Sequence, residues 1–196
     1  MGPPSDLPPR LSAAVKRELQ GERVRWSGRP SPRRAFWTAL PIVLFGIPWT
    51  AGIGVAWVSL FDMTTLAKLT GWMLLAMAGA GLFLLTFLFV GLVMIATPWV
   101  AAHSARNTIH LVTDRRLVTI RAGRLSTKVT TVWPADIVSI ERKERPDGSG
   151  NLKLVLGAHR DSDGDKVTTQ ETISGVANVR GAELALAETR RDKRAA

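Results

Sequence analysis

The chain has 196 residues, 46% of them hydrophobic, and carries 26 lysine and arginine residues against 16 aspartate and glutamate residues, a formal net charge of +10. The charges are segregated, since no charged side chain occurs in residues 35–61 or 69–105. This segregation excludes both a uniform soluble globule and a disordered polycation. Because the sequence contains no cysteine, disulfides, thiol catalysis and cysteine-based metal sites are excluded as well.

Residues 1–34 are expected to form a cytoplasmic tail with a short helix. The four prolines in residues 1–11 favour a flexible start. Residues 11–20 have the composition of a helix, with Ser12 as its expected N-cap. After this helix, Trp26 has two interpretations: its ring lies on the lipid headgroups, or it packs on the C-terminal part of the chain.

Two apolar segments predict transmembrane helices at residues 35–61 and 71–98, joined by an external loop at residues 62–70. Each segment exceeds the roughly 20 residues that cross a hydrocarbon core about 30 Å thick, and neither carries a polar stripe. Tryptophan lies near both ends of each segment, as in the aromatic belts of membrane proteins. These expected interfacial anchors are Trp37, Trp57, Trp72 and Trp99.

Inside the apolar segments, Trp49 falls at mid-membrane depth and is expected to pack between the helices. Gly52 with Ala56, and Ala76 with Ala80, have the four-residue spacing that lets two helices approach closely. A segment rich in glycine and alanine also produces such pairs by chance. A tight helix contact and a chance pattern therefore both stay open.

The basic residues predict the orientation of this hairpin. Eight lysine and arginine residues lie in residues 1–34, the loop holds Lys68, and Arg106 follows the second apolar segment. By the positive-inside rule, this distribution predicts a multi-pass membrane protein with both termini in the cytoplasm and the loop outside.

Residues 104–191 predict a cytoplasmic β-rich domain, followed by a basic tail at residues 192–196. Short runs of alternating polarity are separated by turn signals, and the expected strands cover residues 108–113, 116–121, 127–133, 138–145, 151–159 and 166–173. After Gly175 the period becomes helical, with Asn178 as the expected N-cap. The predicted fold class is therefore α+β, a two-helix transmembrane hairpin plus a small antiparallel β domain closed by a C-terminal helix.

Several short segments occur in an order that is similar to one family. They are Gly21-Glu22, Trp26-Ser27-Gly28-Arg29-Pro30, Thr113-Asp114-Arg115-Arg116-Leu117, Asp136-Ile137, Asp147-Gly148-Ser149-Gly150-Asn151-Leu152 and Ile173-Ser174-Gly175-Val176. In these segments, over roughly residues 18–190, the chain resembles the bacterial pleckstrin-homology (PH)-type membrane proteins, which have two transmembrane helices followed by a PH-like domain. The resemblance implies a strongly bent antiparallel sheet closed by a C-terminal helix, and a scaffold without a defined chemistry. His110 stands where the family commonly has a tyrosine, which weakens any role for an aromatic hydroxyl there.

No catalytic, cofactor or metal site is predicted, and the chain is not expected to be an enzyme. The sequence lacks phosphate-binding glycine motifs and nucleophile elbows. Its three histidines lack the spacing of metal ligands and are expected to be structural. They are His103, His110 and His159.

The acidic residues Asp161, Asp163 and Asp165 imitate the start of a calcium-binding loop. Lys166 and Thr172, however, stand where such a loop needs glycine and glutamate, and a lysine repels the ion. An acidic turn is therefore expected here.

Five basic residues early in the β domain form a candidate contact for anionic lipid headgroups. They are Arg115, Arg116, Arg121, Arg124 and Lys128. Each would contribute about 1 kcal/mol near an anionic surface, and the alternative is that they are ordinary solvated residues. Nucleic acid is not expected as a partner, because Trp133 is the only aromatic residue of the domain and single strands stack on several.

The expected function is that of a non-catalytic, membrane-anchored interaction or scaffold module. Besides the lipid bilayer, its partner would be anionic lipid, another protein or a second copy of the chain, with strand addition to an open sheet edge as one binding mode. The alternative is a small oligomeric transport or channel subunit. Against this alternative, the apolar segments carry no charged residue, and intramembrane charge is the usual mark of an ion path.

Overall fold

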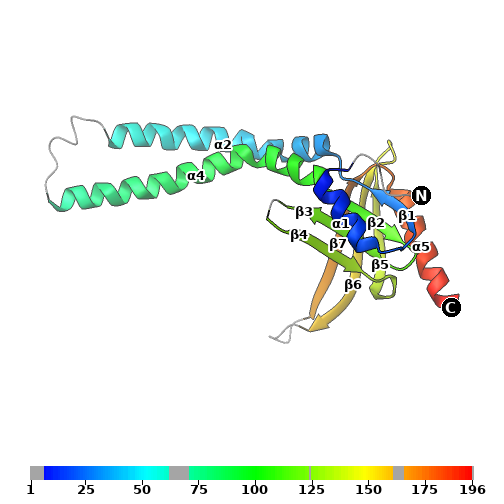
Figure 1. Cartoon of the computed structure of the whole chain (residues 1–196). Helices are drawn as coiled ribbons and strands as arrows, with labels where there is room; N and C mark the ends of the chain where they lie inside the picture. The colour runs from blue at the N-terminus through cyan, green and yellow to red at the C-terminus, as the bar shows by residue number, and fades with distance from the viewer. Residues whose placement is uncertain (1–6, 62–70, 124, 161–165, 196) are drawn as a thin grey trace. The chain divides into compact units, whose positions relative to one another are not determined.

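The computed structural model describes residues 7–61, 71–123, 125–160 and 166–195 (Figure 1). It divides into two compact units. Unit 1 combines Met1–Ala35 with Ala102–Ala196, and unit 2 is Phe36–Ala101. The N-terminal segment therefore belongs to the same unit as the C-terminal domain, and the unit is assembled from both sides of the apolar pair.

Unit 2 consists of most of two long helices, α2 (Pro32–Leu60) and α4 (Trp72–Arg106). Both are long and apolar enough to cross a membrane. Helix α4 continues beyond the expected end at residue 98, and His103 lies in its last turns. The expected loop at residues 62–70 lies outside the described residues.

The two helices pack through Trp49, as expected. Its indole Nε1 donates a hydrogen bond to the carbonyl oxygen of Phe87 at 3.1 Å, and the two rings stack with centroids 5.6 Å apart. A Cβ at Gly91 would lie 3.0 Å from the ring of Trp49, so the close approach depends on that glycine. Gly52, by contrast, faces open space among the described residues, and the Gly52–Ala56 pair takes no part in this contact.

The described part of unit 1 contains two antiparallel sheets that do not close into a barrel, and the α+β fold class is confirmed. The first sheet has the order β1 (Val24–Gly28), β2 (Thr108–Thr113), β3 (Leu117–Ala122) and β4 (Thr127–Val132). The second has the order β5 (Ile137–Glu144), β6 (Gly150–Arg160) and β7 (Lys166–Val176), and the short helix η1 (Pro134–Asp136) links the two. The six expected strands correspond to β2–β7 with ends shifted by a few residues.

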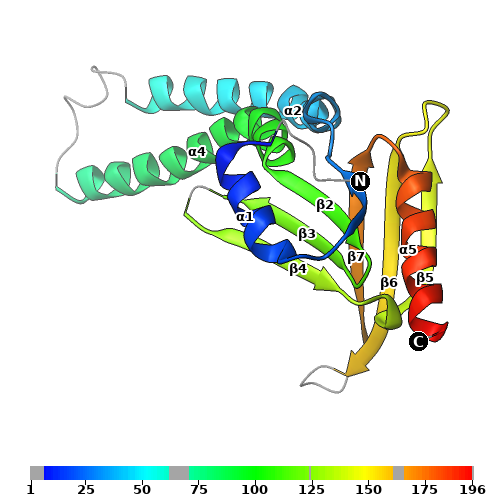
Figure 2. The same cartoon turned by 45° about the vertical axis from the view of Figure 1, so that its right-hand side comes forward.

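Helices cover unit 1 on two sides (Figure 2). Helix α1 (Pro9–Leu19) lies on one face of the first sheet, where Leu11 and Val15 join a fully buried core with Ile109, Leu111 and Ile120. Helix α5 (Val179–Ala195) belongs to a second core between the sheets. That core contains Val112, Leu117, Leu152, Leu154, Ile173, Val179 and Leu186.

Strand β1 was not predicted from the sequence. Its position distinguishes the two interpretations of Trp26. The indole is only 7% exposed and belongs to the core between the sheets, so it packs on the C-terminal domain and does not lie on lipid. Its ring covers Gly28, where a Cβ would overlap the ring atoms. The Trp-Ser-Gly segment therefore has a packing role.

The helix caps follow the expectation at one end of the chain and contradict it at the other. Asn178 caps α5, its Oδ1 accepting a hydrogen bond from the backbone N–H of Gly181 at 2.8 Å. Ser12 is not the N-cap of α1, since it lies within the helix and its hydroxyl donates to the carbonyl oxygen of Pro9 at 2.9 Å. Helix α1 instead starts at Pro9, whose fixed φ angle suits the first helical position.

Candidate functional site

Four of the five basic residues expected to form one lipid contact are described, and they are divided between the two ends of the first sheet. Arg115 and Arg116 lie in the turn after β2, whereas Arg121 pairs with Thr108 at the start of β2 and with Lys128 on β4. Five residue steps of strand, at about 3.3 Å each, separate the two ends by roughly 17 Å. Arg124 lies outside the described residues. The four described side chains therefore do not form a single cluster.

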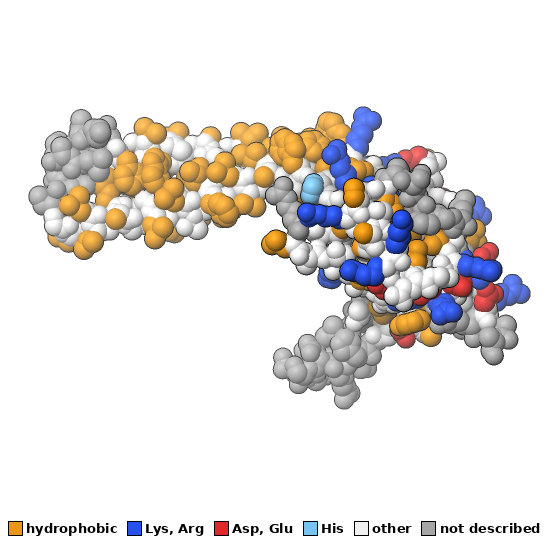
Figure 3. Space-filling model, in the orientation of Figure 1, with side chains coloured by type: hydrophobic (Ala, Val, Ile, Leu, Met, Phe, Trp, Pro, Cys, Tyr) orange, Lys and Arg blue, Asp and Glu red, His pale blue; other side chains and the backbone are white. Residues whose placement is uncertain are grey.

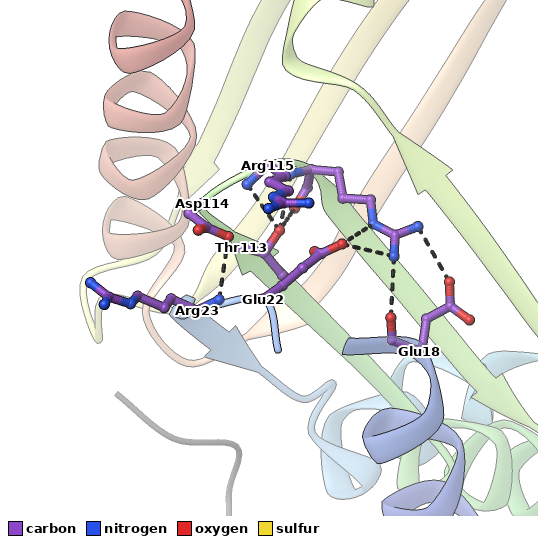
Figure 4. A network of polar contacts seen from close by, with 7 residues as sticks. Glu18, Glu22, Arg23, Thr113, Asp114 and Arg115 are labelled. Carbon is purple, nitrogen blue, oxygen red and sulfur yellow. Dashed lines mark hydrogen bonds and ion pairs between the residues drawn. The ribbon is translucent and has the colours of Figure 1, made fainter. Parts of the chain in front are cut away.

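Arg116 pairs with Glu18 and Glu22, both labelled in Figure 4, and we call these contacts the Arg116 clasp. Its guanidinium pairs with the Glu22 carboxylate at 3.0 Å and with the Glu18 carboxylate at 3.3 Å, and it also donates to the Glu18 carbonyl oxygen at 3.2 Å. Its side chain is 18% exposed, and the ring of Trp133 lies 5.9 Å away. Arg116 thus binds α1 and the segment before β1 to the β2–β3 turn, and its charge is already neutralised.

Hydrogen bonds within unit 1 also hold the rest of the β2–β3 turn, as Figure 4 shows. The backbone N–H of Arg23 donates to the Asp114 carboxylate at 3.3 Å, and the N–H of Asp114 donates to the Arg23 carbonyl oxygen at 3.0 Å. The Thr113 hydroxyl accepts from the N–H groups of Arg115 and Arg116 at 3.2 and 3.0 Å. The segments at residues 21–22 and 113–117, which carry the family resemblance, therefore meet in one structural contact.

A second clasp ties the start of α2 to the β5–β6 turn. The Arg34 guanidinium contacts the Asp147 carboxylate and the Ser149 hydroxyl, and the N–H of Ser31 donates to the Gly175 carbonyl oxygen at 3.1 Å. Hydrogen bonds from Ser149, helped by the Arg34 charge, lower the pKa of Asp147 to about 2. A cavity of about 210 Å³ lies beside these residues. Residues 147–152 and 173–176, two further segments of the family resemblance, therefore both contact the start of α2.

The β3–β4 turn lies at the other end of the first sheet, close to the end of α4. The N–H of Ala122 donates to the carbonyl oxygen of Asn107, the residue after α4, at 2.9 Å. Leu125 in this turn is fully exposed, with a relative accessibility of 102%. Arg10 and Arg17 of α1 line a cavity of about 330 Å³ against the turn, together with Ser126 and Thr127.

Arg121 and Lys128 lie on the other face of the sheet from α1. They line a cleft of about 230 Å³ between the sheets with Thr119, Thr130, Glu171 and Thr172. Basic side chains therefore flank the β3–β4 turn on both faces. We call this set, Arg10, Arg17, Arg121, Leu125 and Lys128, the turn surface.

His110 lies behind this cleft and is 4% exposed, with its Nδ1 3.0 Å from the Thr119 hydroxyl. Burial, assisted by the positive charge of Arg121, lowers the pKa of His110 to about 4. The imidazole is therefore neutral at physiological pH and acts as a buried hydrogen-bonding group.

Of the other candidate ligands, the structure describes only the side chain of His103. The Nε2 of His103 lies 3.0 Å from the amide nitrogen of Asn107. Asp161, Asp163, Asp165 and the side chain of His159 fall outside the part that the structure describes. Among the residues described, no three histidine or carboxylate side chains are placed to hold a metal ion.

Sequence reasoning missed Arg10, Arg17 and Leu125 as members of a surface. The seven-residue spacing of Arg10 and Arg17 places them on one face of a helix, which is a readable signal. Their proximity to Leu125 depends on how α1 crosses the sheet, and that follows from long-range packing. The expected interfacial residues Trp37, Trp72 and Trp99 are exposed on unit 2, whereas Trp57 is partly covered by stacking on Phe61 at 4.6 Å.

Comparisons of the chain with protein-family models, with curated proteins and with solved structures find no match. The resemblance to the PH-type membrane proteins therefore continues to rest on the residues of this sequence alone.

Proposed function

We propose that the chain is an integral protein of the bacterial cytoplasmic membrane, and that unit 1 is a PH-like, non-catalytic interaction module held at the cytoplasmic membrane surface. The observation that carries the proposal is the pairing of β1 with β2. These strands lie on opposite sides of the apolar pair in the sequence, yet Trp26 pairs with Val112 and Gly28 with His110 in one sheet. Strands of one sheet must lie on the same side of a membrane.

This pairing supports a hairpin topology. If α2 and α4 are in a membrane, they must cross it an even number of times for β1 to reach β2. Further contacts within unit 1 agree, since the Arg29 guanidinium donates to the Arg106 carbonyl oxygen at 3.0 Å and joins the chain just before α2 to the last residue of α4. The eight basic residues before the first apolar segment favour the cytoplasm as the side of unit 1.

The architecture favours binding over catalysis. The clasps around Arg116 and Arg34 hold their charged groups in structural contacts, and His110, beside the inter-sheet cleft, is kept neutral by burial. Strands β4 and β7 each lie at one edge of their sheet, and such edges accept an added strand from a partner. A protein, a second copy of the chain or anionic lipid are the partners that this architecture suits.

The helices offer no support for the alternative of a channel subunit. The hydroxyls of Thr50, Thr86 and Thr97 each donate to the carbonyl oxygen four residues earlier in their own helix, at 2.7, 3.0 and 2.9 Å. Hydroxyls engaged in this way are less available to line a polar path. The membrane-anchored module is therefore the better account of unit 2.

Cysteine labelling tests the proposal directly, because the chain has no native cysteine. We expect Thr65→Cys, in the expected external loop, to react with a membrane-impermeant maleimide in intact cells. Val138→Cys, on an exposed position of β5, should react only after permeabilisation. Labelling of position 138 in intact cells, or release of the chain from membranes by alkaline carbonate, would contradict the topology.

A photo-reactive residue tests the interaction role. Placed at Val129 on the outer strand β4, it should yield one discrete cross-linked product in cells, whereas the same residue at Leu184, exposed on α5, should not. Equal products from both positions would indicate random collision rather than binding at the sheet edge.

A further inference from the structure

We propose that the inter-sheet cleft of unit 1 binds a small zwitterionic solute, a free α-amino acid with a short polar side chain. The carboxylate of this solute would lie between Arg121 and Lys128, and its ammonium group would face Glu171. Every residue that carries this inference belongs to unit 1, so the inference does not depend on the membrane topology proposed above. It adds a small-molecule ligand to the proposed interaction module.

The inner face of the first sheet changes from apolar to polar along its strands. Directly paired residues of β2, β3 and β4 form rows across this face. One row belongs to the core between the sheets and consists of Val112, Leu117 and Val132. The next two rows toward the β3–β4 turn are polar: His110, Thr119 and Thr130, then Thr108, Arg121 and Lys128. Packed sheets normally fill the space between their inner faces with apolar side chains, and departures from such a rule are expected at functional sites.

Arg121 and Lys128, two members of the turn surface, are direct cross-strand partners. Like charges in such a pair destabilise a sheet. Within the part of the chain that the structure describes, neither side chain forms an ion pair. Basic side chains are spread over the face of unit 1 that Figure 3 shows, so positive charge by itself does not mark a site. This pair differs because it lines a cleft, where a bound carboxylate would accept hydrogen bonds from both cations and relieve their repulsion.

Glu171 supplies the opposite charge from the second sheet. Ile173, two residues along β7, is buried in the core between the sheets, so strand alternation places Glu171 on the same inner face, where it lines the cleft. Its cross-strand partner Leu154 is also a core residue. Among the described residues, the carboxylate of Glu171 has no ion-pair partner. It would repel a simple anion and attract an ammonium group, so the cleft favours a solute that carries both charges.

The size and the lining of the cleft limit the solute further. A water molecule takes up about 30 Å³ in the liquid, so a cavity of about 230 Å³ accommodates about seven non-hydrogen atoms, fewer than a nucleotide or a sugar phosphate contains. The hydroxyls of Thr119 and Thr130 suit a short polar side chain. Because burial lowers the pKa of His110, its imidazole is neutral and adds no third positive charge, and its Nδ1 lies 3.0 Å from the Thr119 hydroxyl. L-serine has this size and these groups.

The test uses the full chain in detergent micelles and saturation-transfer-difference NMR, which detects weakly bound solutes. Three solutes of nearly the same shape are compared: L-serine, L-glycerate, in which a hydroxyl replaces the ammonium group, and L-serinamide, in which an amide replaces the carboxylate. We expect the native chain to bind L-serine at least about tenfold more tightly than either analogue, because each analogue lacks one charged hydrogen-bonding group.

Two variants assign the charges of the solute to the two walls of the cleft. Glu171→Gln should weaken the binding of L-serine at least about tenfold and bind L-glycerate about as well as L-serine. Arg121→Gln should reduce the preference for L-serine over L-serinamide. The matched controls Glu141→Gln and Arg115→Gln remove the same charges from exposed positions elsewhere on unit 1, and they should bind L-serine like the native chain. A role in folding alone would not change the selectivity between solutes.

The native chain decides the outcome even if a cleft variant fails to fold. Equal binding of the three solutes to the native chain, no saturation transfer to L-serine, or tighter binding of inorganic phosphate than of L-serine would overturn the inference. Equal loss of L-serine binding in the cleft variants and in their matched controls would overturn it as well.

Discussion

Arg116 permits the sharpest prediction about stability. Replacement by methionine keeps the aliphatic stem but removes the only cation that the structure shows between Glu18 and Glu22, whose side chains are 28% and 11% exposed. The second carboxylate oxygen of Glu22 is already buried without a hydrogen-bond partner among the described residues. Removing one partner of a buried ion pair lowers the free energy of unfolding by about 3–5 kcal/mol. Because Glu18 is partly exposed, we expect the lower end of this range, about 3 kcal/mol.

Urea unfolding of the full chain in detergent, followed by near-ultraviolet circular dichroism, measures this loss. With a urea dependence of about 1.5 kcal/mol per molar, the midpoint for unit 1 should fall by about 2 M in Arg116→Met. Arg115→Met, which changes an exposed neighbour, should stay within about 0.5 kcal/mol of the native chain. Adding Glu18→Gln and Glu22→Gln to Arg116→Met should restore part of the loss. An unchanged midpoint in Arg116→Met, or an equal loss in Arg115→Met, would refute the clasp.

Three further predictions concern buried or crowded groups. The free energy of unfolding of unit 1 should fall by about 3 kcal/mol between pH 6.5 and pH 4, because the pKa of His110 is lowered and only the unfolded chain protonates this imidazole in that range. Urea titrations should show a smaller fall in His110→Gln. The lowered pKa of Asp147 stabilises unit 1 above pH 3.8, and this contribution disappears as the pH falls to about 2, so the native chain and Asp147→Asn should converge in acid unfolding curves. Gly91→Leu should destabilise the helix pair by about 1–3 kcal/mol in thermal unfolding, whereas Gly52→Leu, at an open position, should not.

The parts of this structure that sequence reasoning reached are those with a local pattern. Apolar length predicted the two helices, strand periodicity predicted β2–β7, and the position of Trp49 in an apolar segment predicted its packing between helices. Asn178 was predicted as a cap because the signal lies next to the helix that it caps.

The parts that were missed depend on contacts between distant residues. Strand β1 is short, contains Arg25 and has an irregular register between Val24 and Trp26, so no alternation marks it. Its partner strand lies beyond both apolar helices. The pairing of Arg116 with Glu18 likewise requires knowing where α1 lies, and without that position the arginine looks like any other basic residue after the second apolar segment.

The division of unit 1 between two ends of the chain has a consequence for its synthesis. Strand β1 leaves the ribosome before either apolar helix, whereas β2 follows both, so at 5–20 residues per second the N-terminal segment waits several seconds for its partner strand. During that interval Trp26 and the apolar face of α1, with Leu11 and Val15, have no sheet to cover them. The sheet can therefore be completed only after both helices have been made, and a chain stalled before that step presents an exposed apolar segment to chaperones and proteases.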